Sequence, residues 1–158
     1  MSCSYYDSPL GKIKIEEQDS YIVGISFEND KALINKEINI EKEKNIIAKC
    51  KAQLDEYFKG NRKEFDLEIK FIKGTEFQKN VWNELRKIPY GETISYKTLA
   101  ERIGNPKACR AVGGANNKNP IGIIIPCHRV IGANGKMIGY AEGVDKKEFL
   151  LGLEYKNK

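Results

Sequence analysis

A run of branched apolar residues in the C-terminal half leads directly into three chemically active side chains. Residues 121–130 read IGIIIPCHRV, in which Pro126 closes the apolar part and Cys127, His128 and Arg129 follow it. His128 is the only histidine of the chain. Because four isoleucines favour burial of the sulfur that follows them, we interpret Cys127 as a shielded nucleophile. The alternative is that Cys127 is one more small core residue, as free cysteine often is.

The adjacency of the thiol and the imidazole restricts how the two could cooperate. Neighbouring side chains point to opposite faces of a strand and diverge by about 100° around a helix. A direct hydrogen bond between Cys127 and His128 is therefore disfavoured. If His128 activates the sulfur, it acts through a bridging water or across a tight turn, with a carboxylate elsewhere orienting the ring.

Length and composition limit the class of protein. The chain has 158 residues, of which 41% are hydrophobic, enough to bury a core. No apolar run approaches the ~20 residues of a membrane-spanning helix, and the N-terminus has no signal pattern. We therefore expect a cytoplasmic protein. Richness in Lys, Ile and Asn favours a prokaryotic source, and we also expect a monomer. The four cysteines lack CxxC pairing and accompanying histidines, so we expect no zinc site and no cofactor.

Charge divides the chain near residues 73–74. Residues 1–74 hold 13 Lys/Arg and 14 Asp/Glu, whereas residues 75–158 hold 14 and 8. The imbalance is sharpest in a basic strip, which we define as Lys97, Arg102, Lys107, Arg110, Lys118, Arg129 and Lys136. Such a strip favours an acidic polymer as partner. A solvated lysine-rich surface is the alternative.

The first 74 residues have the pattern of a small α/β domain. Alternating apolar residues predict two antiparallel strands around residues 13–15 and 21–27, and a third strand over 65–71. Between them, helical spacing predicts a helix from about residue 41 to 58. This domain, residues 1–74, shows no histidine and no glycine-rich loop, so we interpret it as a scaffold.

Residues 75–158 have the pattern of a helical domain. Thr75 and Gln78 predict a capping box that opens a helix ending near residue 88. Ser95 predicts the cap of a helix over 96–103, and Asn105 the cap of another over 106–117. These two short helices outline a helix-turn-helix. A hairpin turn is expected at 132–135, a pocket-lining loop at 139–143, and a last helix over 146–153 that brings Glu154 to its end.

The helix expected over 106–117 leaves one side nearly bare, because its residues include Ala108, Ala111, Gly113, Gly114 and Ala115. Two adjacent glycines weaken a helix by about 1 kcal/mol each relative to alanine. Close approach to another surface would offset that loss, and a DNA groove fits the flanking basic residues best. Packing of the bare side on another part of the protein is the alternative.

Four segments resemble one known family in order and spacing. TEFQKNVWNELRKIPYGETISYKTLA, NPKACRAVGGANNKNP, IIIPCHRVIG and LLGLE are similar to the methylated-DNA–protein-cysteine methyltransferases, also called O6-alkylguanine-DNA alkyltransferases. The similarity covers about residues 75–154. It implies an α+β fold with a ribonuclease-H-like α/β scaffold in residues 1–74. Residues 75–158 would form a winged-helix-like helix-turn-helix domain that carries the active-site cysteine.

The resemblance also implies residue roles. Cys127 would accept the alkyl group from O6 of guanine, His128 would act as a water-mediated base polarised by Glu154, and Asn119 would brace the active-site turn. The flipped base would meet Tyr96, Val130, Tyr140 and Ala141, and DNA would be bound by Tyr96, Lys97, Asn105, Arg110, Ala111, Gly113 and Gly114. The family commonly has serine where this chain has Ala141, followed by a small residue where it has Glu142.

The implied substrate is double-stranded DNA containing O6-alkylguanine, with O4-alkylthymine left open. An interior sulfur reaches such a base only when the nucleotide is flipped out, and the attacking species is a thiolate. The thioether product is not hydrolysed, so each molecule acts once. Two alternatives are a lesion-binding module of the alkyltransferase-like type, which lacks the cysteine, and a cysteine hydrolase, for which no oxyanion loop is evident.

Overall fold

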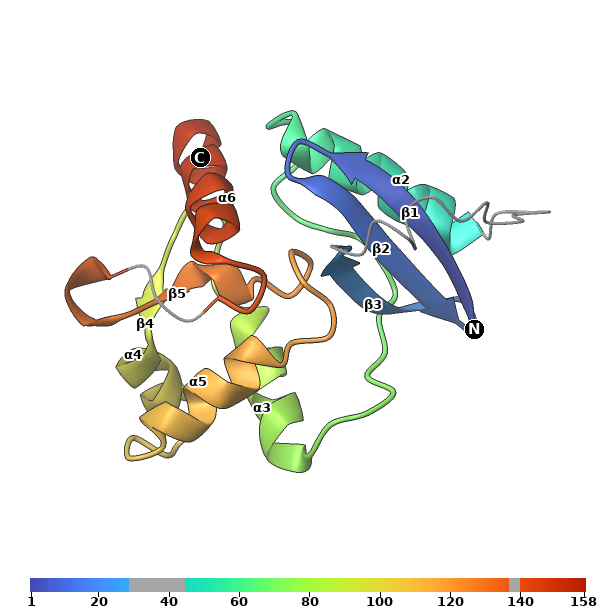
Figure 1. Cartoon of the computed structure of the whole chain (residues 1–158). Coiled ribbons are helices and arrows are strands. Elements are labelled where there is room, and N and C mark those ends of the chain that lie inside the picture. Colours follow the sequence, from blue (N-terminus) through green and yellow to red (C-terminus); the bar gives the residue numbers. More distant parts are fainter. Residues whose placement is uncertain (29–44, 137–139) are drawn as a thin grey trace. The chain divides into compact units, whose positions relative to one another are not determined.

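The computed structural model describes residues 1–28, 45–136 and 140–158 (Figure 1). The chain divides into two compact units, an N-terminal unit of Met1–Ile72 and a C-terminal unit of Lys73–Lys158. Within the described residues, no helix combines the length and the apolar character needed to cross a membrane.

The N-terminal unit contains an antiparallel three-stranded sheet in the order β1 (Ser2–Ser8), β2 (Gly11–Gln18) and β3 (Tyr21–Phe27). Helix α2 (Asn45–Phe58) packs on this sheet (Figure 1). Alternation places Ile13 and Ile15 of β2 on the buried face. Helical spacing places Ile47, Cys50 and Leu54 of α2 in the same core. The α/β architecture expected for this half is therefore confirmed.

Two details of this unit differ from the sequence prediction. Strand β1 was not predicted, because only Ser4 of its seven residues is buried and it lacks an apolar face. The strand predicted over 65–71 is wrong. That segment meets β3 at a single parallel bridge between Ile69 and Ile22, with Ile22 N donating to Glu68 O and Lys70 N donating to Ile22 O. The helix predicted from residue 41 is confirmed for 45–58, and residues 41–44 lie outside the described residues.

The C-terminal unit is built from short helices around a two-stranded parallel sheet. Its elements are α3 (Glu76–Leu85), β4 (Ile94–Ser95), α4 (Tyr96–Arg102), α5 (Cys109–Asn117), η1 (Cys127–Arg129), β5 (Val130–Ile131), η2 (Ala133–Gly135) and α6 (Val144–Asn157). Strands β4 and β5 pair through Ile94 with Val130 and Ser95 with Ile131. This pairing joins the start of α4 to the end of η1, which carries Cys127.

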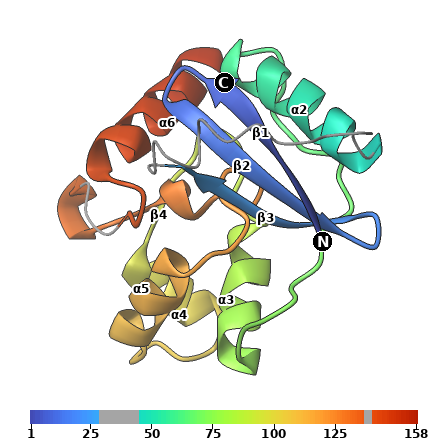
Figure 2. The same ribbon diagram turned by 45° about the vertical axis from the view of Figure 1, so that its right-hand side comes forward.

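Helices α3, α4 and α5 pack together at one end of this unit (Figure 2). The predicted capping box of α3 is confirmed, since Thr75 Oγ1 accepts from Gln78 N at 3.1 Å and Gln78 Oε1 accepts from Thr75 N at 3.0 Å. Trp82 Nε1 of α3 donates to Ala115 O of α5 at 2.8 Å. The predicted Ser95 cap of α4 is also confirmed. Helices α4 and α5 thus form the expected helix-turn-helix outline.

Three boundaries in this unit correct the sequence prediction. Helix α5 begins at Cys109, and its N-cap is Ala108, so the prediction that Asn105 caps this helix is wrong. Asn105 instead opens a turn in which its carbonyl accepts from Ala108 N at 3.0 Å. Residues 133–135 form the 3-10 turn η2, with Gly132 N donating to Lys136 O. Helix α6 extends to Asn157, so Glu154 lies within it.

Candidate active site

A strained turn delivers Cys127 into the interior of the C-terminal unit. Ile123 has φ of 68°, a left-handed conformation that costs a β-branched residue energy. Asn119 closes this turn from both sides, since its Nδ2 donates to Ile125 O at 2.7 Å and its Oδ1 accepts from Ile121 N at 3.0 Å. These two hydrogen bonds of Asn119 hold the strained backbone of Ile123 in place near the thiol.

The Cys127 thiol is shielded from solvent. Its residue is 6% exposed and begins the 3-10 turn η1. Burial raises the pKa of Cys127 to about 11, although a hydrogen bond from Asn119 and the charge of Lys147 oppose the increase. Cys127 therefore rests as a thiol near neutral pH, and a nucleophilic role requires a base.

His128 is fully buried and bonded to a carboxylate far along the chain. Its Nε2 lies 2.6 Å from Oε2 of Glu154 on α6. Arg129, the next residue, binds the same carboxylate with two hydrogen bonds: its Nε donates to Oε1 at 2.8 Å and its Nη2 donates to Oε2 at 3.1 Å. Gly91 N donates to Oε1 at 3.3 Å. The Glu154 carboxylate is thus held by an arginine fork, an imidazole and a backbone amide.

These contacts determine the protonation of the pair. Burial favours the neutral form of Glu154, but its electrostatic interactions and hydrogen bonds with His128 and Arg129 outweigh burial and lower the pKa of Glu154. Burial also lowers the pKa of His128, against the attraction of Glu154. We infer an ionised Glu154 beside a neutral His128 that carries its proton on Nε2. Its Nδ1 is buried and, among the described residues, has no hydrogen-bond partner.

Both halves of the chain match family models. Residues 1–71 match the ribonuclease-like domain of 6-O-methylguanine DNA methyltransferase, and residues 76–156 match its DNA binding domain. The chain belongs to the 6-O-methylguanine DNA methyltransferase family. The resemblance seen in the sequence and the α+β fold class are therefore confirmed.

Individual relatives cover almost the whole chain of this family member. The methylated-DNA–protein-cysteine methyltransferase of Methanosarcina acetivorans is 49% identical over 154 residues, covering 98% of each chain. That of Mycobacterium leprae is 45% identical, covering 96% of this chain and 91% of the relative. The crystal structure of Mycobacterium tuberculosis OGT in complex with DNA is 41% identical, with a TM-score of 0.85 over 97% of this chain and 92% of that chain.

The residues expected to line the base pocket of this methyltransferase fall into two groups. Tyr140 and Val130 are buried, whereas Tyr96 is half-buried and Ala141 is exposed. Burial raises the pKa of Tyr140, and the proximity of Cys127 adds to the increase. Tyr140 therefore lies within the electrostatic reach of the thiol. Tyr96 opens α4, and its ring would lie 3.8 Å from a Cβ added at Gly113.

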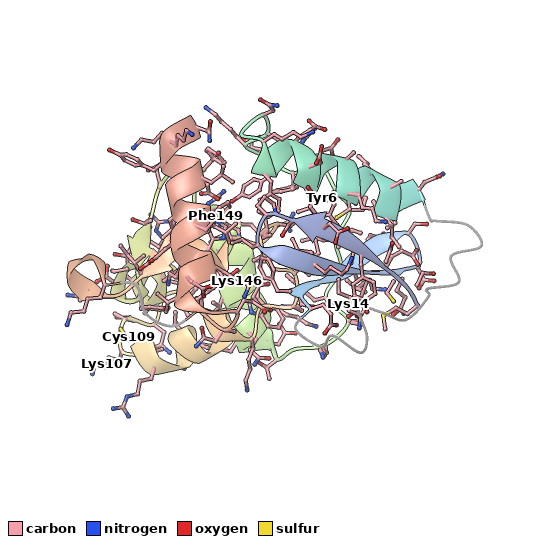
Figure 3. The ribbon with its side chains drawn as sticks, turned by 45° about the horizontal axis from the view of Figure 1, so that its top comes forward. Tyr6, Lys14, Lys107, Cys109, Lys146 and Phe149 are labelled. Atoms are coloured by element: carbon pink, nitrogen blue, oxygen red, sulfur yellow. The ribbon has the colours of Figure 1, made fainter. Side chains whose placement is uncertain are left out.

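Most of the bare side of α5 faces outward, but Ala115, which was predicted to lie on that side, is buried. Of the predicted DNA-contact residues, Lys97, Asn105, Arg110, Ala111 and Gly114 are exposed, and Gly113 is half-buried. A Cβ added at Gly114 would meet no atom within 4 Å, so packing inside the described protein does not require this glycine. Helix α5 instead packs on its neighbours through Val112 and Ala115. Figure 3 shows Lys107 and Cys109 at the N-terminal end of this helix.

One member of the predicted basic strip was assigned wrongly. Six of its seven residues are exposed, but Arg129 is 6% exposed and bonded to Glu154. Arg129 Nη1 also donates to Ile88 O at 2.7 Å. Its charge is therefore used inside the fold, and the outward basic surface consists of Lys97, Arg102, Lys107, Arg110, Lys118 and Lys136.

Two further side chains at the site were not predicted from the sequence. Asn116 of α5 is buried, and its Nδ2 donates to Cys127 O at 3.3 Å. Lys147 of α6 is buried, and its Nζ donates to Val130 O. A polar residue on the buried face of a helix is the signal that could have indicated both. Across the described ranges, no group of three or more His, Cys, Asp or Glu side chains could hold a metal ion.

Proposed function

We propose that this chain repairs DNA by moving the alkyl group of O6-alkylguanine onto Cys127, once per molecule. The observation that carries the proposal is a buried thiol next to a histidine whose far nitrogen is bonded to an ionised, arginine-held carboxylate. Membership of the 6-O-methylguanine DNA methyltransferase family supports the same reaction.

The proton of Cys127 is the first obstacle. With the pKa of Cys127 at about 11, only ~10⁻⁴ of the thiol is ionised at pH 7. We propose that a water bridges the thiol to Nδ1 of His128 and that the imidazole gains a proton as the sulfur attacks. Glu154, held ionised by Arg129, then stabilises the imidazolium.

The transfer step consumes the protein. The sulfur of Cys127 forms a bond to the alkyl carbon while the bond from that carbon to guanine O6 breaks. The electron pair of the broken bond stays on the guanine, which takes up one proton from solvent. The imidazolium of His128 gives the proton it received from Cys127 back to solvent, so that guanine and the thioether are the products. The product on the protein is a thioether, which has no hydrolysable bond. A cofactor is not needed, because the sulfur is the acceptor and the guanine is the leaving group.

DNA recognition follows from the outward basic surface and the bare helix. We propose that α5 lies in the minor groove and that Arg110 fills the gap left by the flipped nucleotide. Tyr96, Val130, Tyr140 and Ala141 would surround the base, with Lys97, Asn105, Ala111, Gly113 and Gly114 near the backbone and groove. Residues 75–158 would thus hold the whole reaction site, with residues 1–74 as scaffold.

The experiment uses duplex DNA containing O6-methylguanine with a radiolabelled methyl group. We expect label to move to wild-type protein and to the Cys109→Ser control, whose altered cysteine lies on α5, but not to Cys127→Ala. Tight binding without label transfer would favour a lesion-binding module. Release of labelled methanol with turnover would favour a hydrolase.

A further inference from the structure

A lysine is buried beside the proposed reaction site. Lys147 lies in the first turn of α6 and is 0% exposed. Lysine is almost never fully buried unless its charge is used, since desolvation of an ammonium costs energy. The proposed transfer mechanism does not explain why the charged side chain of Lys147 is buried.

Its surroundings come from three elements of the site. Nζ donates to the carbonyl of Val130 on β5. It also lies 5.8 Å from the ring centroid of Tyr96 on α4. Val130 directly follows the turn η1 that Cys127 begins, and the charge of Lys147 lowers the pKa of Cys127 while Cys127 raises the pKa of Lys147. The ammonium of Lys147 thus bonds to one expected wall of the base pocket, lies near the ring of a second and acts electrostatically on the thiol.

A second buried side chain provides a comparison. Asn116 Nδ2 donates to the carbonyl of Cys127 just as Lys147 donates to that of Val130. Val130 is one of the residues proposed to surround the flipped base, and each of these two carbonyls keeps a second lone pair for a ligand. Asn116 is neutral, so it orients a carbonyl without adding charge. Lys147 does both.

We propose that Lys147 is a positioning residue of the transfer reaction, whose buried ammonium fixes the Val130 carbonyl and stabilises the negative charge that develops on the Cys127 sulfur. The ammonium keeps its proton throughout, so it acts as a fixed charge and His128 remains the base. This role rests on the proposed alkyl transfer and adds to it the group that favours the thiolate.

The charge of Lys147 is itself sensitive to pH. Burial lowers the pKa of Lys147 to about 8, against the attraction of Cys127. Charged and titratable groups around it are Cys127 and His128 on η1, Tyr96 on α4, and Glu142, which raises the pKa of Cys127. The pKa of His128 is lowered and that of Tyr96 is raised. Between pH 7 and 9, Lys147 is therefore the neighbour that changes its charge.

The test measures the alkylation rate of Cys127 by iodoacetamide in the full-length protein without DNA, read from the mass of the peptide that contains Cys127. Wild type is compared with Lys147→Met, Lys147→Arg and the control Lys156→Met, the same substitution at an exposed lysine of the same helix. At pH 7 we expect Lys147→Met to react at least ~10-fold more slowly than wild type, about one pKa unit. Lys147→Arg should keep most of the rate, and Lys156→Met should remain within about threefold of wild type.

The pH profile separates a charge effect from a packing effect. Because Lys147 loses its proton as pH rises through about 8, the advantage of wild type over Lys147→Met should fade by pH 9 to 10. A ratio that stays constant with pH, or lies below twofold at pH 7, would overturn the proposal. If Lys147→Met does not fold, the pH profile of wild type alone tests the proposal. Below its pKa, a thiol with constant surroundings becomes tenfold more reactive per pH unit. Because Lys147 loses its charge near pH 8, the alkylation rate of wild type should rise less than tenfold per pH unit there, and a full tenfold rise would overturn the proposal.

Methyl uptake from O6-methylguanine DNA is measured in parallel on the same proteins. A wild-type protein that takes up no methyl group refutes the proposed function, whatever the iodoacetamide profile shows. A wild type that takes up methyl but has a pH-independent ratio refutes only the role of Lys147. The two failures are therefore distinguishable.

Discussion

Replacing Arg129 with methionine tests whether its charge is used inside the fold. Arg129→Met keeps much of the side-chain length and apolar volume but removes the two nitrogen contacts to Glu154 at 2.8 and 3.1 Å and the contact to Ile88 O at 2.7 Å. Removing one partner of a buried ion pair costs about 3–5 kcal/mol, because the other charge stays buried. His128 remains bonded to Glu154, so we expect the lower end, about 3 kcal/mol.

The assay follows Trp82 fluorescence during urea unfolding. Trp82 is the only tryptophan of the chain and is 2% exposed in α3, so its signal reports on the C-terminal unit. The matched control is Arg110→Met, the same substitution at an exposed arginine of α5, which should change the free energy of unfolding by less than ~0.5 kcal/mol. A loss below ~1 kcal/mol for Arg129→Met, or an equal loss for Arg110→Met, would refute the reasoning.

The same variant has a pH dependence of known sign. The pKa of Glu154 is lowered in the folded protein, so its pairing stabilises the fold above the unfolded pKa of about 4.3 and is lost as pH falls below that value. The difference in stability between wild type and Arg129→Met should therefore shrink in acid. A difference that grows as pH falls would show that Glu154 is not the group that Arg129 stabilises.

Substitutions at three further residues test the strained turn and helix α5. Asn119→Ala removes the hydrogen bonds to Ile121 N and Ile125 O, so we expect the free energy of unfolding in urea to fall by about 2 kcal/mol and methyl transfer to be slower. The exposed Asn117→Ala is the control, and an equal or larger loss of stability for that variant would contradict this. Gly114→Ala should raise helix stability by up to ~1 kcal/mol, because no atom lies within 4 Å of the added Cβ. Gly114→Leu should instead weaken duplex binding in a fluorescence titration. Unchanged binding by Gly114→Leu would count against contact of this face with DNA. Arg110→Ala should slow reaction with duplex lesions far more than reaction with free O6-benzylguanine, and equal losses on both substrates would remove its assigned role.

Local signals in the sequence predicted much of the C-terminal unit. The Thr75 capping box and the Ser95 cap are chemical patterns that depend on only three or four neighbouring residues, and the structure confirms both. The bare side of α5 was also visible in the sequence, because small residues cluster there. What the sequence could not decide was whether that side faces protein or solvent. Open space around Gly114 now favours solvent within the described protein.

Three of the failures share a physical cause, since each depended on how a residue or segment meets another element of the chain. Arg129 has the same composition signal as an exposed arginine, and only its pairing with Glu154, 25 residues away, makes it internal. Strand β1 lacks an apolar pattern and is held by its pairing with β2. Residues 65–71 have the alternation of a strand but meet β3 at a single bridge. Local periodicity contains no information about such partners.

The most direct test of the account is the mass of the protein after reaction with a tenfold excess of duplex DNA containing O6-methylguanine. We predict that every chain gains one methyl group, that peptide mapping assigns it to Cys127 rather than to Cys3, Cys50 or Cys109, and that uptake then stops. Methylation spread over several cysteines, or continued loss of lesions after Cys127 is fully methylated, would contradict the claim that one buried thiol is consumed.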